Sequence, residues 1–81
     1  MYFVYLVSCK DSTFYAGITT DVARRVTEHN TSPKGAKYTR ARRPVQLVYS
    51  KKYKTRSAAQ TAEAKIKKLP RAAKLKLIYE I

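Results

Sequence analysis

The chain has 81 residues, with 18 Lys or Arg against 5 Asp or Glu, so its formal net charge is +13. This length is enough for one modest core, and we expect a single domain over residues 1–81. The charge imbalance favours a polyanionic partner, with nucleic acid ahead of an anionic membrane surface. The single cysteine excludes an internal disulfide and a cysteine-rich zinc site. No apolar run approaches the roughly 18 residues of a membrane helix, and no signal peptide is visible, so we expect a cytoplasmic protein without membrane association.

The N-terminal residues predict two strands joined by a short turn. Residues 2–8 are aromatic and β-branched, with apolar side chains on both faces, which is typical of a central strand. Residues 9–13 supply polar turn chemistry, and residues 14–18 form a second apolar run that contains a glycine. The two strands are therefore expected to pair as a hairpin.

The length of this turn predicts which side chains face each other. If Ser8 pairs with Phe14, Tyr5 lies opposite Gly17, and Tyr5 and Tyr15 project from the same face of the sheet. Gly17 then leaves a gap beside Tyr5 where a ligand can approach the backbone. The strand pattern alone favours the simpler alternative, in which both tyrosines are core residues hydrogen-bonded at one edge.

A short helix is predicted from about Asp21 to Asn30. At 100° per residue, Arg25 and His29 fall on or beside its apolar stripe. Arg24 points to solvent instead, where it can pair with Glu28 one turn later. Of the two adjacent arginines, the geometry therefore selects Arg25 as the one that faces the sheet.

The segment from Thr31 to Pro44 is predicted to be a basic loop. Its positive side chains surround one tyrosine, and the set is Lys34, Lys37, Tyr38, Arg40, Arg42 and Arg43. A solvated loop is the default interpretation of such a run. Because the whole chain is basic, we favour a nucleic-acid-binding loop, with phosphates on the cations and a base stacked on the tyrosine.

The C-terminal half predicts one strand and two helices. The strand covers Val45–Tyr53 with alternating apolar residues. A helix capped by a box at Ser57–Gln60 runs to about Leu69, and its apolar stripe consists of Ala59, Ala62, Ile66 and Leu69. A last helix to about Tyr79 is expected to bury Ala72, Leu75, Ile78 and Tyr79. The order ββαβαα predicts an α/β fold of the α+β type, a mainly antiparallel three-stranded sheet flanked by helices.

Glu63 is selected as a candidate metal ligand by elimination, because cleavage of a phosphodiester usually requires a cation held by carboxylate oxygen. The other four carboxylates lie in a turn, at a helix start, on an exposed helix face and beside the C-terminus: Asp11, Asp21, Glu28 and Glu80. Helix geometry alone favours a simpler role for Glu63, a salt bridge to Lys67. One carboxylate excludes a two-metal site and a two-acid glycosidase pair.

The segments Phe3-Val4-Tyr5 and Tyr15-Ala16-Gly17, followed by Arg25, His29 and Glu63, form a specific combination. With this combination the chain resembles the GIY-YIG nuclease superfamily, most closely its small stand-alone members. Two further stretches look like that branch, Gly17–Asn30 and Lys34–Arg40. The chain departs from the signature at Phe3, where the family has glycine, and at Ala16, where it has isoleucine.

The resemblance implies a nuclease fold with one divalent cation, Mg²⁺ or Mn²⁺, bound by Glu63. It also implies that Arg25 stabilises the transition-state phosphate. Tyr5 and Tyr15 would face the metal and the attacking water, one of them as general base, and His29 would orient or deprotonate a tyrosine. A tyrosine base needs its pKa of about 10 lowered by the cation and the arginine.

Our first hypothesis is a metal-dependent endonuclease that acts on structured or damaged DNA, as in DNA repair, with little sequence preference. The alternative is a non-catalytic nucleic-acid-binding module that keeps the nuclease fold. A third, weaker hypothesis is a basic adaptor for an acidic protein. DNA is favoured over RNA, a protein partner for targeting remains an option, and the chain is expected to be a monomer or weak homodimer.

Overall fold

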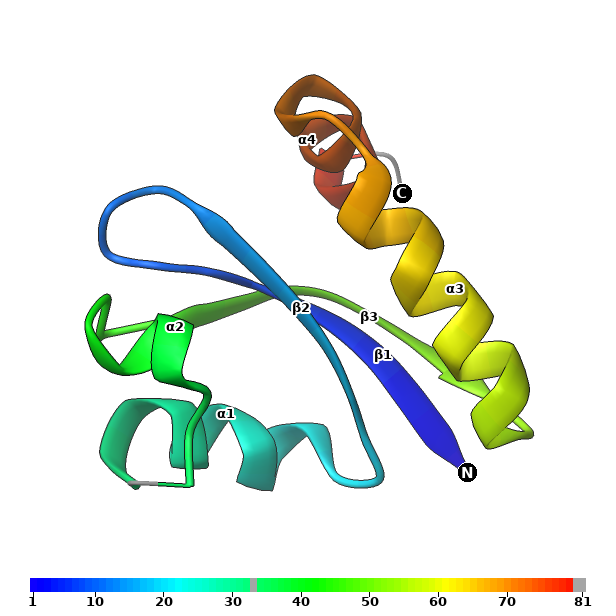
Figure 1. The fold of residues 1–81 in the computed structure, drawn as a ribbon, viewed down its shortest axis with the longest axis horizontal. Coiled ribbons are helices and arrows are strands. Elements are labelled where there is room, and N and C mark those ends of the chain that lie inside the picture. The colour runs from blue at the N-terminus through cyan, green and yellow to red at the C-terminus, as the bar shows by residue number, and fades with distance from the viewer. Residues whose placement is uncertain (33, 80–81) are drawn as a thin grey trace.

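Three antiparallel strands form the centre of the molecule, and helices cover both faces of the sheet (Figure 1). The strands are β1 (Tyr2–Ser8), β2 (Phe14–Thr19) and β3 (Gln46–Tyr53), in the order β2-β1-β3. This computed structural model describes residues 1–32 and 34–79, so Glu80 lies outside the described residues. The predicted α+β fold and the central position of β1 are both confirmed.

The helices are α1 (Val22–Thr31), α2 (Lys37–Arg40), α3 (Arg56–Lys68) and α4 (Arg71–Tyr79). In Figure 1, α1 and α2 lie on one side of the sheet, and α3 lies on the other. The segment predicted to be a loop from Thr31 to Pro44 therefore contains one helical turn, α2, which the sequence did not indicate. Among the described residues, no helix is long and apolar enough to cross a membrane.

Each face of β1 contributes to its own apolar cluster because side chains alternate along a strand. One cluster, under α3, has Val4, Leu6, Ala16, Ala59 and Ile66 as its buried members. The other has Tyr5, Val7, Cys9 and Val45 as buried members, with Tyr15, Val22 and Val26 packed against them. Burying each large side chain contributes about 1.5–3 kcal/mol. Because β1 supplies buried side chains to both clusters, both depend on this strand.

The predicted hairpin register is confirmed. Ser8 pairs with Phe14, Val7 with Tyr15 and Tyr5 with Gly17. This register places both signature tyrosines in the α1-side cluster, as the alternation of side chains required.

The start of α3 differs from the prediction. Thr55 is the N-cap, and its hydroxyl accepts a hydrogen bond from the amide of Ala58. The predicted capping box at Ser57–Gln60 is wrong because Thr55, two residues earlier, satisfies the free amide of Ala58. α1 begins as expected, with Asp21 as the N-cap that accepts from the amide of Arg24.

The burial predicted for α4 is only partly correct. Ile78 is partly buried against the α3-side cluster and Leu75 is half-buried. Ala72 and Tyr79 are exposed, with Tyr79 at 78%. Because α4 lies beyond the end of α3 in Figure 1, it has little sheet beneath it to cover its apolar side chains.

Candidate active site

Tyr5 and Tyr15 project from neighbouring strands toward α1, and their rings meet at His29. The ring centroid of His29 lies 5.7 Å from that of Tyr5 and 5.4 Å from that of Tyr15. Tyr5 is only 1% exposed, whereas Tyr15 is half-buried. Tyr15 is therefore the phenol that faces solvent, and Tyr5 is the phenol in the interior.

Gly17 makes room for the Tyr5 ring rather than for a ligand. A Cβ atom at Gly17 would lie 2.7 Å from Cζ of Tyr5 and still closer to its hydroxyl oxygen. The predicted gap beside Tyr5 is wrong because the phenol itself lies across the glycine and fills the space. Glycine at this position thus lets the hydroxyl reach the β2 edge of the sheet.

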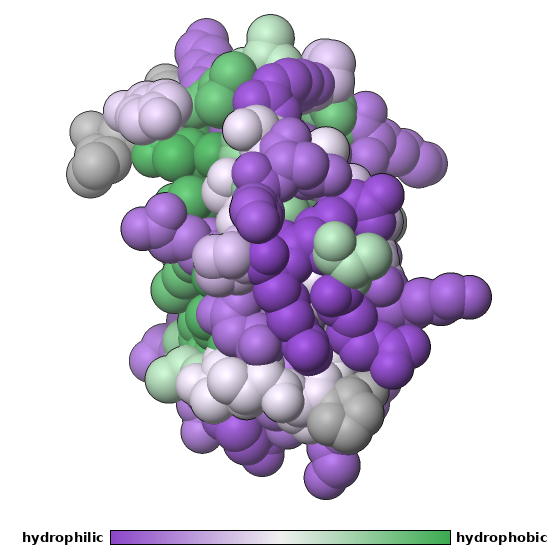
Figure 2. Space-filling model, turned by 90° about the vertical axis from the view of Figure 1, so that its left-hand side faces the viewer, coloured by the Kyte–Doolittle hydropathy of each residue, from purple (hydrophilic) through white to green (hydrophobic). Residues whose placement is uncertain are grey.

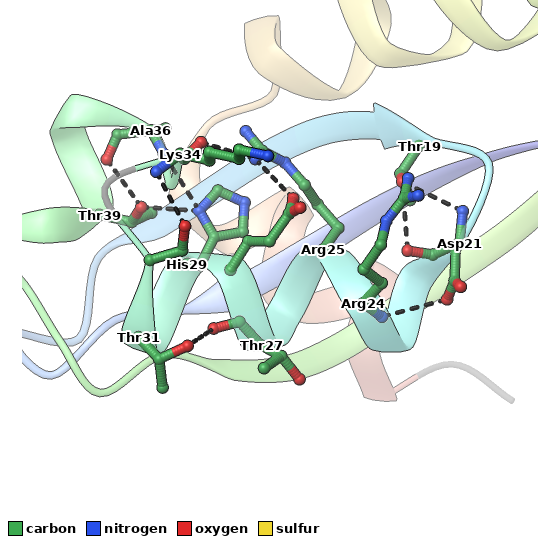
Figure 3. Close-up of polar contacts among 12 residues, drawn as sticks. Thr19, Asp21, Arg24, Arg25, Thr27, His29, Thr31, Lys34, Ala36 and Thr39 are labelled. Atoms are coloured by element: carbon green, nitrogen blue, oxygen red, sulfur yellow. Dashed lines mark hydrogen bonds and ion pairs between the residues drawn. The ribbon is translucent and has the colours of Figure 1, made fainter.

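His29 is completely buried, and side chains from two other elements contact both of its ring nitrogens. Nε2 lies 2.7 Å from the Tyr5 hydroxyl. Nδ1 lies 2.7 Å from the Thr39 hydroxyl (Figure 3). The backbone amide of Ala36 also points at Nδ1, at 3.4 Å. The position of α2 against α1 therefore holds the imidazole ring in one orientation.

The hydroxyl of Thr39 links His29 to the first turn of α2. It donates to the Ala36 carbonyl at 2.9 Å, which also accepts from the backbone amides of Thr39 and Arg40. Its oxygen lies 2.7 Å from Nδ1, and the Ala36 amide points at the same nitrogen at 3.4 Å. The ring is thus held at Nδ1 by α2 and at Nε2 by Tyr5.

Burial, together with the positive charges of Arg25 and Arg43 and against the opposing charge of Glu28, lowers the pKa of His29 to about 4. The ring is therefore neutral at physiological pH. A neutral imidazole in contact through Nε2 can orient the Tyr5 hydroxyl. It is poorly suited to accept the proton of Tyr5.

Arg25 lies between α1, the Tyr5 hydroxyl and the loop that follows α1. Its guanidinium donates to the Glu28 carboxylate at 3.1 Å and to the Lys34 carbonyl at 2.9 Å (Figure 3). Burial raises the pKa of Tyr5, and the nearby Arg25 guanidinium opposes this rise. Arg25 is thus the cation that favours the Tyr5 phenolate, but burial outweighs it, so the pKa of Tyr5 is above its ordinary value and not below it as a tyrosine base requires.

The predicted ion pair between Arg24 and Glu28 is wrong, because Glu28 pairs with Arg25 at i,i+3. Glu28 is also half-buried, not on an exposed face as expected. Glu28 lies three residues after Arg25 on α1, so the two side chains face the same side of the helix. Arg24 is left exposed on the outer side of the helix.

Glu63 lies on α3, the helix on the other side of the sheet from α1 (Figure 1). Its charge and that of Tyr15 both raise the pKa of Tyr5, and the influence of Glu63 is the smallest of those that act on this phenol. Its side chain is 22% exposed and forms an ion pair of 3.5 Å with Lys67, the simpler role that helix geometry favoured. The surface bridge is weak enough not to exclude a second role.

Two arginines of the basic loop serve the fold. Arg43 donates to the carbonyls of His29 and Ser32, the latter just beyond the last residue of α1. Arg42 pairs with Asp11 at 2.9 Å and donates to the Tyr38 carbonyl. These guanidinium groups are therefore committed to protein partners at the ends of α1 and α2.

Tyr38 is occupied as well. Its ring stacks on Tyr15 at a centroid distance of 5.9 Å, and the Arg42 guanidinium lies 3.9 Å from its centre. We therefore interpret Tyr38 as a support for Tyr15 rather than as a platform for a nucleic-acid base. The other cations of the set, Lys34, Lys37 and Arg40, are exposed. Figure 2 shows that the side of the molecule bearing α2 is largely hydrophilic.

Thr39 is a site residue that sequence reasoning missed. It is completely buried and contacts Nδ1 of His29. Its only sequence signal is a hydroxyl residue in the short TRA stretch between basic side chains, which does not distinguish it from a surface threonine. The partner appears only once α2 is folded against α1.

The residues of this site fit a divalent cation only if most of its ligands are water or substrate oxygens rather than protein groups. Among residues 1–32 and 34–79, no group of three His, Cys, Asp or Glu side chains is placed to bind a metal. Of the carboxylates in this described part of the chain, Glu63 is the one whose charge acts on Tyr5, and its ion-pair partner is Lys67. Mg²⁺ keeps several water ligands and often takes one carboxylate plus substrate phosphates, so this donor set fits Mg²⁺ and not a fully protein-bound ion.

The fold and the site together define a small α+β domain. In it, a second strand tyrosine, a helix arginine and a buried histidine lie around the phenol of Tyr5. The chain belongs to the GIY-YIG family: the model of the GIY-YIG catalytic domain matches residues 1–76.

Relatives with similar sequences bear out this assignment. A UPF0213 protein of Desulfotalea psychrophila is 54% identical over 77 residues, which cover 95% of this chain and 70% of the relative. A UPF0213 protein of Streptococcus agalactiae is 51% identical, with 96% of this chain and 88% of the relative covered.

Two structures solved by NMR have a similar fold. The UPF0213 protein BH0048 of Bacillus halodurans is 43% identical, with a TM-score of 0.61 over 96% of this chain and 83% of that one. A protein of E. faecalis is 51% identical, with a TM-score of 0.60 over 90% of this chain and 77% of that one.

Proposed function

We propose that this protein is a metal-dependent endonuclease that hydrolyses phosphodiester bonds in structured or damaged DNA with little sequence preference. The observation that carries the proposal is the convergence on the Tyr5 hydroxyl. His29 contacts it at 2.7 Å, and Arg25, Tyr15 and Glu63 all act on its pKa. A role in packing alone does not explain why a guanidinium, a second phenol and a carboxylate all influence the one buried oxygen of Tyr5.

In this mechanism Tyr5 is the general base. When Tyr5 is ionised, the neutral His29 ring would carry its proton on Nε2, so that this N–H and the Arg25 guanidinium stabilise the phenolate, which removes the proton from the attacking water. His29 stays neutral throughout, because burial and neighbouring cations hold its pKa near 4. Tyr15, which is more exposed, orients the water or the phosphate.

Arg25 also faces the phosphate. Its contacts with Glu28 and the Lys34 carbonyl fix the guanidinium before substrate arrives, so little reorganisation is needed in the transition state. A planar guanidinium presents fixed, bidentate charge to phosphate oxygens, which lysine does not.

Glu63 is the proposed ligand for a single Mg²⁺ or Mn²⁺. When bound, the cation would neutralise developing charge on the phosphate and would offset the effect of the Glu63 charge on the pKa of Tyr5. Lys67 must release the carboxylate for this purpose, which an exposed ion pair of 3.5 Å allows at small cost.

A nicking assay on supercoiled and branched DNA with Mg²⁺ tests the proposal. Wild type is expected to cut, and Arg25→Ala and Glu63→Ala are expected to lose about 10²-fold or more in rate. Lys68→Ala, an exposed cation on the same helix as Glu63, serves as the folded control. Absence of metal-dependent product from purified wild type on every DNA form would refute the proposal.

The alternative is a nucleic-acid-binding module without turnover. The pairing of Glu63 with Lys67 and the scarcity of carboxylates favour it. Salt-sensitive binding of DNA without cleavage in the same assay would select this alternative.

A further inference from the structure

A polar cleft of about 330 Å³ lies next to Arg25 at the C-terminal end of β2. Arg24 and Arg25 of α1 line one side, Arg56 at the start of α3 lines another, and Tyr2 and Ile18 form part of the wall. Helices on opposite faces of the sheet therefore bring three guanidinium groups to the edge strand.

The charge in this cleft is not balanced. Glu28 is the only carboxylate among its lining residues, and it pairs with Arg25. Within residues 1–32 and 34–79, the side chains of Arg24 and Arg56 form no hydrogen bond or ion pair with another protein group, and both residues are exposed. Arg42 and Arg43 differ from them, because protein groups occupy both of those guanidiniums.

We infer that Arg24 and Arg56 form a second phosphate-binding subsite, which holds the phosphodiester next to the one that Arg25 contacts. The inference rests on the proposed function for the identity of the polyanion. Two free guanidinium groups from different helices, beside a third that faces the reacting phosphate, match two successive phosphates of one strand. The subsite would fix the direction in which the strand crosses the β2 edge.

The test is a binding measurement that does not depend on cleavage. Fluorescence anisotropy with a labelled branched DNA in EDTA, over a range of NaCl concentrations, gives the slope of log K against log salt. The variants are Arg24→Gln, Arg56→Gln and Lys68→Gln, the last of which removes one charge from α3 about 18 Å along the helix from Arg56. Circular dichroism confirms that each variant is folded.

Each arginine variant is expected to reduce the slope by about 0.9, the value for one phosphate contact on duplex DNA. Lys68→Gln is expected to leave the slope within error of wild type. Equal slopes for all variants, or an equal loss in Lys68→Gln, would overturn the subsite. If wild type does not cut DNA with Mg²⁺, the proposed nuclease activity is refuted. The salt slopes measured in EDTA would still test the subsite.

Discussion

The Tyr5 hydroxyl is the atom on which most of the site residues act. A buried histidine contacts it at 2.7 Å, and it lies across a glycine that leaves it space. Substitutions here separate packing from chemistry, because a single oxygen can be removed while the ring remains.

Tyr5→Phe removes this hydroxyl and keeps the ring. We expect it to lower the single-turnover cleavage rate by about 10² to 10⁴-fold, the usual contribution of a general base. The variant also leaves the buried Nε2 of His29 without its partner, which should cost about 1–3 kcal/mol of stability. Tyr53→Phe, on β3, is the matched control. Cleavage by Tyr5→Phe at the rate of wild type would exclude Tyr5 as the base.

Gly17→Ala tests whether the position of the ring matters. The new methyl group would overlap the Tyr5 ring, with Cζ at 2.7 Å, so the variant should lose about 1–3 kcal/mol of unfolding free energy. Urea unfolding gives the value, and Gly17→Ala in the Tyr5→Phe background should be milder because the closest atom is gone. Unchanged stability of the single variant would mean that the ring moves freely.

His29 predicts a pH dependence of stability. Its pKa is about 4 in the folded protein and 6.5 in the unfolded chain, so the unfolded state binds more protons between these values. The stabilisation is complete above pH 6.5 and is lost as pH falls toward 4. Between pH 7.5 and 4.5 wild type should lose about 2–3 kcal/mol more than His29→Gln in urea unfolding. Equal losses in the two proteins would show that His29 is not held neutral.

At the scale of elements, the site depends on how α1, α2 and α3 are fixed at their ends. Asp21 caps α1, Thr55 caps α3, and Arg43 binds carbonyl groups at the end of α1. None of these groups faces a substrate, yet each sets the position of a helix that carries a site residue.

Thr55→Ala should destabilise the protein by about 1 kcal/mol, because the Ala58 amide loses its side-chain acceptor. Ser57→Ala, two residues later, should change the unfolding free energy little, since Thr55 is the cap. Thermal or urea unfolding of both variants distinguishes them. A larger loss of stability in Ser57→Ala than in Thr55→Ala would instead indicate the capping box predicted from the sequence.

The basic loop separates into structural and exposed cations. Arg43→Ala should cost about 2–3 kcal/mol of stability, because charge-assisted hydrogen bonds to the carbonyls of His29 and Ser32 are lost. Arg40→Ala should keep stability and weaken DNA binding. Unfolding and anisotropy measurements on the same two variants show whether this division holds.

At the scale of the whole molecule, the sequence predicted the sheet, its register and the face of α1 well. Aromatic and β-branched runs with a five-residue turn leave little choice of pairing, and helical periodicity places Arg25 and His29. The sequence could not predict α2 or the role of Thr39, because a four-residue helix has almost no periodicity. It also misassigned the partner of Glu28, since neighbouring arginines differ only in where the folded chain points them.

The proposed function would need few acidic residues at this site. A net charge of +13 favours a polyanionic partner, and we propose that Glu63 is the single carboxylate that would hold the cation. Most of the remaining cations are then available for phosphate contacts that carry no sequence information.

The most direct test of the account is the single-turnover cleavage rate as a function of Mg²⁺ concentration for wild type, Glu63→Gln and Lys67→Gln. The account predicts that wild type saturates with Mg²⁺, that Glu63→Gln loses about 10²-fold or more, and that Lys67→Gln retains activity because it removes only the competing cation. Metal-dependent cleavage by Glu63→Gln at the wild-type rate would contradict the account.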